Sequence, residues 1–275
     1  MGPAKAPVTI TAATRKGSGR TNQDRYIIGP NFAAVLDGAS NFSEENPQHD
    51  GGWYAETLAA KLRKLLAAQP DGALPEIVGR AIESVATEHD LRSNSSPTST
   101  IALARWDDEQ AEVYVLGDST VAIIHPDGRE DVYSDHRLAS IGEDLRRAYR
   151  ERLAAGSGFD HQHLQLLASL QAEQARWRNR EDGYWIAGAT SAAASRGIVQ
   201  SLKWPDVSRI AIASDGAAAA VSKYRLFPSW AVLAGLDAQE VLVAVEAHES
   251  LDGDGTAWPR SKRHDDKTLL LLERA

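Results

Sequence analysis

Hydrophobic and polar positions alternate near the start of the chain. Between Pro7 and Thr14 the apolar residues Val8, Ile10 and Ala12 alternate with Thr9 and Thr11. This period of two is typical of a half-buried strand. The short apolar segments 26–28 and 32–36 follow, and their length and spacing predict two strands that pair as a hairpin.

Three more apolar runs occupy the middle of the chain, at 99–106, 112–116 and 121–125. Each run is short and rich in β-branched or aromatic residues, and polar residues separate them. We expect consecutive antiparallel strands here, with Asp118 in the turn between two of them. Another strand is predicted at 210–213, directly before Asp215.

Helical spacing appears in the other parts of the sequence. Leucines recur at that spacing over residues 53–68, and apolar residues do so again over residues 74–85. Residues 142–185 are rich in charge and carry a weaker helical pattern. Asp237 and Glu240 have the spacing of a capping box, which predicts the start of a last helix. Strand-rich and helix-rich stretches therefore alternate along the chain.

Composition narrows the chemistry. The chain has 275 residues and no cysteine, so disulfides, thiolate metal sites and cysteine nucleophiles are excluded. A chain of this length can bury one full core, and we expect a single domain over residues 1–275. The net charge of -8 disfavours a nucleic-acid partner, because phosphate backbones are bound by clustered lysine and arginine.

The apolar runs are too short for a membrane helix, which needs roughly 20 apolar residues. Residues 1–7 have no apolar stretch of the kind found in a secretion signal. We therefore predict a soluble cytoplasmic protein with no membrane partner. The sequence leaves the oligomeric state open.

Three acids lie at the ends of strand-like runs. Asp37 with Gly38 and Asp215 with Gly216 each follow an apolar run, and Asp265 precedes the apolar segment 269–272. A strand end places a side chain rigidly, and glycine lets the backbone approach a ligand. Acids that converge from separate strands bind hard divalent cations. Any one Asp-Gly pair taken alone is an ordinary turn signal.

The order of these pieces is more specific than any one of them. The sequence resembles metal-dependent protein phosphatases of the PP2C (PPM) family, in their bacterial form. The resemblance implies an α+β fold, with two antiparallel sheets packed as a sandwich and flanked by helices. The matching pieces, in the order of the family, are Asn22-Gln23-Asp24, Asp37-Gly38, Ser99-Thr100, Gly117-Asp118-Ser119, Asp135-His136, Ser214-Asp215-Gly216 and Asp265-Asp266-Lys267-Thr268.

The resemblance also implies a site and a reaction. Asp37 would bridge two Mn²⁺ or Mg²⁺ ions, the Gly38 carbonyl would bind one of them, and Asp215 with Asp265 would bind the other. Asp24 would orient a water that the ions acidify. Asp118 would hold a third, weaker ion. The substrate would be a protein carrying phosphoserine or phosphothreonine.

An arginine shortly before Asp24 binds the substrate phosphate in this family, which suits the bidentate guanidinium. Arg20 is the nearest candidate. It stands one residue closer to Asp24 than is usual, so Arg15 stays an alternative. A basic glycine-serine loop that is merely solvated is the plainer interpretation of this segment.

The chain departs from the family pattern at several positions. Ala39 and Ser40 follow the first Asp-Gly pair where relatives often have a second glycine and a histidine, and a polar loop over residues 42–50 is inserted after them. Ala219 replaces an acid or amide, which weakens the third metal site. Asp266 stands where the family usually has asparagine, and we choose Asp265 as the ligand because neighbouring strand residues point to opposite sides.

Residues 142–185 correspond to the variable flap beside the active site of relatives. A solvated helical insertion without a role in recognition is the competing interpretation. Two other functions stay open at this stage: a catalytically impaired relative that acts as a binding or regulatory module, and a phosphatase of small phosphorylated metabolites. The retained acids Asp37, Asp215 and Asp265 favour an enzyme.

Overall fold

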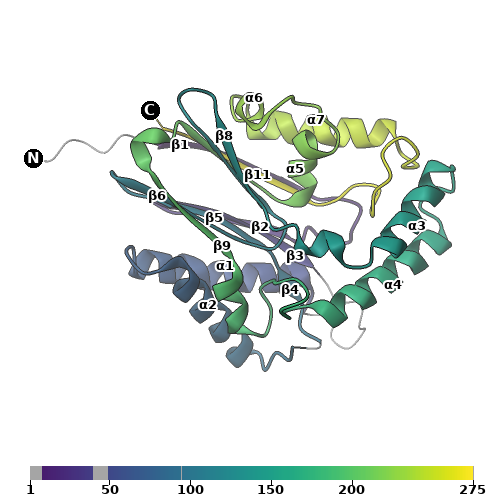
Figure 1. Cartoon of the computed structure of the whole chain (residues 1–275), viewed down its shortest axis with the longest axis horizontal. Coiled ribbons are helices and arrows are strands. Elements are labelled where there is room, and N and C mark those ends of the chain that lie inside the picture. Colours follow the sequence, from purple (N-terminus) through teal and green to yellow (C-terminus); the bar gives the residue numbers. More distant parts are fainter. Residues whose placement is uncertain (1–7, 40–48, 94, 275) are drawn as a thin grey trace, which may run out of the picture.

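Two antiparallel β-sheets face each other at the centre of the protein (Figure 1). A computed structural model describes residues 8–39, 49–93 and 95–274. One sheet has five strands in the order β1-β11-β10-β7-β8, and the other has the order β2-β3-β5-β6-β9 with the short β4 beside β3. The strands are β1 Val8–Arg15, β2 Asp24–Ile28, β3 Phe32–Ala39, β4 Thr98–Ser99, β5 Ile101–Trp106, β6 Gln110–Leu116, β7 Thr120–Ile124, β8 Glu130–Tyr133, β9 Ile198–Lys203, β10 Arg209–Ala213 and β11 Lys267–Arg274.

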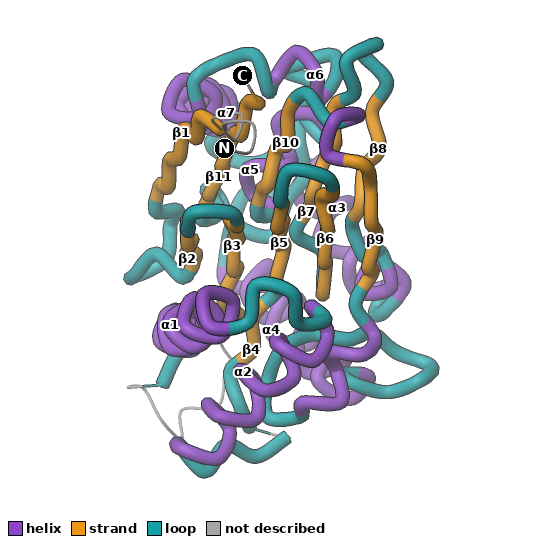
Figure 2. Tube along the Cα trace, turned by 90° about the vertical axis from the view of Figure 1, so that its left-hand side faces the viewer, coloured by secondary structure: helices purple, strands orange, loops and turns teal. Residues whose placement is uncertain are grey.

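Helices cover the outer face of each sheet (Figure 2). Helices α1 and α2 pack on the six-stranded sheet, while α5, α6 and α7 pack on the five-stranded one. Within the described residues no helix combines the length and the apolar character that a membrane span requires. The helices are α1 Gly51–Ala68, α2 Leu74–Glu88, α3 Glu143–Ala154, α4 His161–Trp177, α5 Asp215–Ser222, α6 Trp230–Leu233 and α7 Ala238–Leu251.

The predicted α+β sandwich is confirmed, and so are most of its elements. Alternation placed β1 to within one residue at its start, and the leucine spacing placed α1 and α2. Asp237 caps α7, accepting hydrogen bonds from the backbone N–H groups of Gln239 and Glu240. Helices α1 and α2 were readable because each has one buried face. In β1 the expectation for Ala12 was wrong, because Ala12 is exposed and Ala13 is buried against the helices of the five-stranded sheet, while Val8 and Ile10 pack between the sheets.

The middle strands differ from the expectation of consecutive neighbours. β5 and β6 pair, but β7 pairs with β10 and β8 in the other sheet. The chain crosses between the sheets at Gly117, which has a positive φ of 88°. A reversal of this kind leaves no room for a side chain, because a Cβ on Gly117 would lie 2.9 Å from the Thr100 side chain. Asp118 is therefore carried to the end of the sandwich rather than to a simple hairpin turn.

Helices α3 and α4 occupy the charge-rich segment and pack against each other. Tyr149, Leu153 and Leu170 form a small core between them. Leu164 of α4, by contrast, is 57% exposed. Figure 1 shows this helix pair beside the end of the sandwich where β3 and β4 lie.

Candidate active site

The two strands that begin the six-stranded sheet bring the first acids together. Asp24 opens β2 and lies opposite Asp37 of β3 in the antiparallel register. The backbone of Asp37 is fixed on its other side by Thr100, whose hydroxyl accepts from the Asp37 N–H at 3.1 Å and whose N–H donates to the Asp37 carbonyl at 2.9 Å. The neighbouring strands β2 and β3 thus hold Asp24 and Asp37 opposite each other.

Asp118 reaches the same end of the molecule through the crossover between the sheets. The Ser119 hydroxyl lies 2.6 Å from the Thr100 hydroxyl and so ties the crossover to the segment that supports Asp37. The Ser134 hydroxyl donates to the Asp118 carbonyl at 3.0 Å. Asp118 is therefore more than an isolated turn residue, because hydrogen bonds fix its position relative to Asp37.

Asp215 and Asp265 come from the other sheet. Asp215 is the first residue of α5, and Asp265 lies just before β11. Gly216 allows these segments to meet, because a Cβ there would lie 2.1 Å from the Asp266 carbonyl oxygen. A carboxylate in the first turn of a helix is favoured by the helix dipole. The two acids from the C-terminal half of the chain therefore adjoin each other.

We refer to Asp24, Asp37, Asp118, Asp215 and Asp265 as the carboxylate cluster. Asp24 is buried at 2% exposure, while Asp215 is open to solvent. Burial and then the charge of Asp24 raise the pKa of Asp37 well above its ordinary value, and Asp215, Asp265 and Asp118 add to the shift. The five side chains therefore share one electrostatic environment that solvent can reach.

Mutual repulsion extends through the cluster. Crowding by protein atoms, then the charges of Asp265 and Asp118, raise the pKa of Asp215 to about 8. Because Asp215 keeps contact with solvent, we give more weight to repulsion than to burial in this shift. Burial, followed by Asp135 and Asp265, also raises the pKa of Asp118. Charged carboxylates in this cluster thus need cations.

Asp24 is the most deeply buried of the five. Burial raises its pKa to about 6, although the hydroxyls of Ser214 and Thr268 lower it in part. Neither carboxylate oxygen has a hydrogen-bond partner of good geometry. A buried acid without such partners is costly, so Asp24 has the character of a group that awaits a ligand.

The donor set fits hard divalent cations in chemistry and charge. Aspartate oxygens are the ligands that Mg²⁺ and Mn²⁺ prefer, and the unpartnered oxygens of Asp24 together with the raised pKa values mark a shortage of positive charge. Among the described residues, no three histidine or acidic side chains are close enough to one another to hold an ion.

The arginine candidates take different positions. Arg15 pairs with Glu246 of α7 and is thereby engaged away from the cluster. Arg20 is exposed in the loop that follows β1. This loop packs on the segment before β11, because the Ser18 N–H donates to the His264 carbonyl at 2.8 Å. Arg20 therefore extends from a loop that is anchored beside Asp265.

Asp266 has a structural position. Its two carboxylate oxygens accept from the backbone N–H groups of Gly17, at 2.7 Å, and Gln23, at 2.9 Å. Asp266 thus fixes the loop that carries Arg20, and its oxygens are committed to these bonds. Gly38 lies where a Cβ would be 2.2 Å from the Gly51 carbonyl oxygen, so no larger residue fits there. Ala219 packs on the core between the five-stranded sheet and its helices.

Sequence reasoning missed the charged residues around α7 and β11. Glu249, Asp252, Arg260, His264 and Lys267 form what we call the buried ion-pair network. Lys267 Nζ lies 2.8 Å from Glu249 Oε2, and Arg260 Nη1 lies 2.6 Å from Asp252 Oδ2. The segment 253–262 has the composition of a solvated loop, but Arg260, 5% exposed, anchors it through Asp252 and the carbonyl of Glu249.

Lys262 was also missed. Its Nζ donates to Asp265 Oδ1 at 2.6 Å. The only signal in the sequence was a lysine three residues before an acid, which is too common outside helices to indicate a contact. The insertion after Ala39 that the sequence marked lies largely outside the described residues. His49, at its end, stacks on Trp53 with ring centroids 3.9 Å apart.

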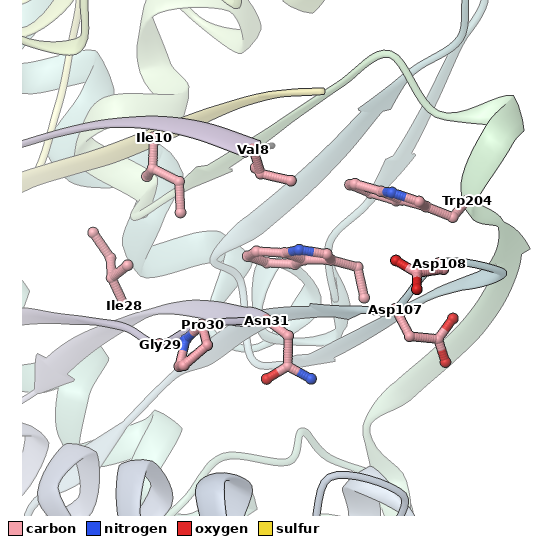
Figure 3. Close-up of a pocket in the computed structure, with 10 residues that line it drawn as sticks. Val8, Ile10, Ile28, Gly29, Pro30, Asn31, Asp107, Asp108 and Trp204 are labelled. Carbon is pink, nitrogen blue, oxygen red and sulfur yellow. The ribbon is translucent and has the colours of Figure 1, made fainter. Parts of the chain in front are cut away.

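A cavity of about 450 Å³ lies apart from these acids (Figure 3). Val8, Ile10 and Ile28 line one part, and Trp204 and Asp108 line another. Its tryptophans, Trp106 and Trp204, stack with centroids 5.9 Å apart. None of the residues expected to bind metal or substrate lines this cavity, so it is separate from the carboxylate cluster.

Comparison with known proteins agrees with this geometry. The family model for protein phosphatase 2C matches residues 13–251. A search of curated protein sequences finds no match.

Among solved structures, the catalytic domain of the serine/threonine protein phosphatase PstP in complex with two manganese ions is 14% identical, with a TM-score of 0.59 and 97% of each chain covered. Stp1 from Staphylococcus aureus is 13% identical, with a TM-score of 0.59 and coverage of 98% of this chain and 96% of that one. PppA from Pseudomonas aeruginosa is 16% identical, with a TM-score of 0.57 and 98% of each chain covered.

These likenesses extend over nearly the whole chain and establish the fold, and the family model covers most of the residues that build the carboxylate cluster. The chain therefore belongs to the protein phosphatase 2C family.

Proposed function

We propose that this protein is a metal-dependent phosphatase that removes phosphate from phosphoserine and phosphothreonine in other proteins. The observation that supports the proposal is the carboxylate cluster, in which burial and neighbouring acids raise the pKa values of Asp24, Asp37, Asp118 and Asp215, and in which Asp24 lacks a hydrogen-bond partner of good geometry. When its carboxylates are ionised, the cluster carries a negative charge that added cations would neutralise. Membership of the family supports the same chemistry.

The ligands follow from position. Asp37 is central, because the other four acids all act on its pKa. We propose that Asp37, the Gly38 carbonyl, Asp215 and Asp265 hold two Mn²⁺ or Mg²⁺ ions. Ions bound there would acidify a water and neutralise charge on the phosphoryl oxygens.

Asp24 has the features of a residue that orients the attacking water. Its two carboxylate oxygens lack partners of good geometry and can accept hydrogen bonds, and the pairing of β2 with β3 fixes the backbone of Asp24 opposite Asp37.

Arg20 is proposed to bind the phosphate of the substrate. Its loop is anchored by Asp266 through Gly17 and Gln23, and no ion pair of the described residues engages its guanidinium. Arg15 is less suited, because Glu246 already pairs with it.

The helices α3 and α4 are proposed to form a flap that contacts the substrate protein. They lie at the end of the sandwich that carries the acids (Figure 1), and their outer faces are polar and charged. The whole chain would act as one catalytic domain with this insertion at about 142–185.

The first experiment is hydrolysis of a chromogenic phosphate ester with and without Mn²⁺. We expect turnover that requires the ion and disappears in Asp37→Asn. A wild-type protein without turnover at any Mn²⁺ concentration would instead favour the impaired binding module.

Substrate class needs a second comparison. Phosphoserine and phosphothreonine peptides are tested against sugar phosphates at matched concentrations. We expect higher kcat/KM for the peptides. A preference for the sugar phosphates would favour the metabolite phosphatase.

A further inference from the structure

The ammonium of Lys262 lies inside the field of the carboxylate cluster. It donates to Asp265 Oδ1 at 2.6 Å. The charge of Asp265 and its hydrogen bond, with further contributions from Asp37 and Asp215, raise the pKa of Lys262. Lys262 therefore contacts Asp265 directly and interacts electrostatically with Asp37 and Asp215, the other two acids that are proposed to hold the metal ions.

No other lysine or arginine takes this position in the described part of the chain. Of the ion pairs found there, Lys262 with Asp265 is the one that reaches the cluster. The loop that carries Lys262 is held in place by Arg260, whose guanidinium binds Asp252 and the backbone carbonyl of Glu249. The buried contacts of Arg260 thus fix the position of the backbone from which Lys262 reaches Asp265.

We infer that Lys262 is an internal counter-ion of the metal-free site, which a divalent cation must displace in order to bind between Asp37, Asp215 and Asp265. This inference rests on the proposed metal site. It identifies a residue that sets the affinity of that site without being a ligand.

Size explains why an ammonium and a metal exclude each other. An N–H···O contact between charged groups spans about 2.7–2.9 Å, whereas Mg²⁺ binds oxygen at about 2.0–2.1 Å. The Asp265 oxygen that accepts from Lys262 at 2.6 Å therefore has to exchange this longer contact for a shorter one when an ion binds.

Lys262 can leave the site. Its side chain is 49% exposed, and the four-carbon stem of a lysine rotates freely in water. Lys267 offers a contrast, because it is 2% exposed and bound both to Glu249 and to the Asp265 carbonyl. Only Lys262 of the two has a path to solvent along which a metal ion can replace it.

The test is calorimetric titration of Mn²⁺ into metal-free protein. The variants are Lys262→Met and, as a matched control, Lys61→Met, which removes a lysine paired with Glu88 on the surface of α1 and α2. We expect Lys262→Met to bind the first Mn²⁺ about tenfold more tightly, within the range of roughly 5–150-fold typical of coupling between sites. The control should match the wild type.

The metal-free proteins give a second, opposite readout. In chelator, Lys262→Met should unfold at a lower temperature than Lys61→Met, because the cluster has lost its counter-ion. Lys262→Arg keeps the charge and should bind Mn²⁺ no more tightly than the wild type, which preserves the test if the methionine variant folds poorly.

Equal Mn²⁺ affinities for Lys262→Met and wild type would overturn the inference while leaving the metal site intact. Weaker binding by Lys262→Met would also overturn it, because Lys262 would then organise the ligands rather than compete. If the wild type and both variants bound no Mn²⁺, the proposed metal site itself would be wrong, and the inference with it.

Discussion

Asp24 and Glu249 are equally buried, at 2% exposure each, but their surroundings differ. Glu249 contacts Lys267 at 2.8 Å, His264 at 3.0 Å and the Tyr224 hydroxyl at 3.0 Å. Asp24 has no hydrogen-bond partner of good geometry on either oxygen, and the negative charges of Asp266 and Asp265 raise its pKa further. Asp24 belongs to the carboxylate cluster, and Glu249 belongs to the buried ion-pair network.

The same contrast appears in the pKa values. Burial raises the pKa of Asp252, but hydrogen bonds from the Ala257 backbone and from Arg260 more than offset it, so the net shift is downward. In the cluster the shifts of Asp24, Asp37, Asp118 and Asp215 are all upward. A network that carries its own cations stabilises the fold, whereas a cluster that lacks them is available to bind cations from solution.

Asp37→Asn should have the largest effect on activity. Removal of the central ligand charge is expected to lower kcat for a chromogenic phosphate ester by roughly 100-fold or more. The thermal midpoint of the metal-free variant should not fall, because one repulsive charge is gone. Near-normal turnover in Mn²⁺ would place the metal site elsewhere.

Arg260→Met should have the largest effect on stability. It leaves Asp252 buried without its cation, which destabilises a protein by about 3–5 kcal/mol. Denaturant unfolding measures the loss, and Arg263→Met, an exposed neighbour in the same loop, is the control. A change below that of the control would mean that the network is not the stabilising element we describe.

Arg20→Ala removes an exposed cation, in contrast to the buried Arg260. Loss of a hydrogen bond to a charged phosphate should raise KM roughly tenfold while kcat changes little. The fold should be unaffected. Lys16→Ala, in the same loop, serves as the comparison, and an unchanged KM in Arg20→Ala would remove Arg20 from the site.

Asp118→Ala should have a smaller effect within the cluster. Ala219 supplies no ligand, so Asp118 is the main carboxylate left for a third ion, and that ion would bind weakly. We expect the variant to keep two tightly bound Mn²⁺ ions, with lower activity and a higher Mn²⁺ requirement. Calorimetry and activity that match the wild type would limit Asp118 to its place in the crossover.

The smallest expected effect is the dependence of stability on pH. Asp24 and Asp215 have folded-state pKa values of about 6 and about 8, against 3.8 for the ordinary value. The folded protein therefore binds more protons than the unfolded chain between these limits, and stability should fall as pH rises from about 4 to 8. Thermal unfolding in chelator measures this slope.

Mn²⁺ should reverse the trend, with a larger rise in thermal midpoint at pH 8 than at pH 5. Asp37→Asn should flatten the slope in chelator. A metal-free midpoint that rises over this range would contradict the raised pKa values.

Much of the fold could be predicted because its signals are local. The alternation of Val8 and Ile10 and the leucine spacing of α1 each reflect one buried face. The change of sheet after β6 could not be predicted, because a short apolar strand does not specify its partner. Only Gly117, with its positive φ, marks the crossover.

The candidate site divides in the same way. Asp37, Asp215 and Asp265 were recognisable because each has a distinct local setting at a strand end, and the order of the motifs added specificity. The contacts of Arg260 and Lys262 had no such signal. Both residues lie in a segment whose composition resembles a solvated loop. Their different roles follow only from their partners, because Arg260 binds Asp252 and anchors the loop, whereas Lys262 binds Asp265 of the carboxylate cluster.

The sequence by itself therefore determined which acids this protein has, which apolar runs they adjoin and which family they match. The tertiary structure decided which acids receive a cation from the protein. Asp24 and Asp265 are 241 residues apart in the chain, yet the charge of one shifts the pKa of the other. Electrostatic energy depends on distance and burial in space, and neither is written in the order of residues.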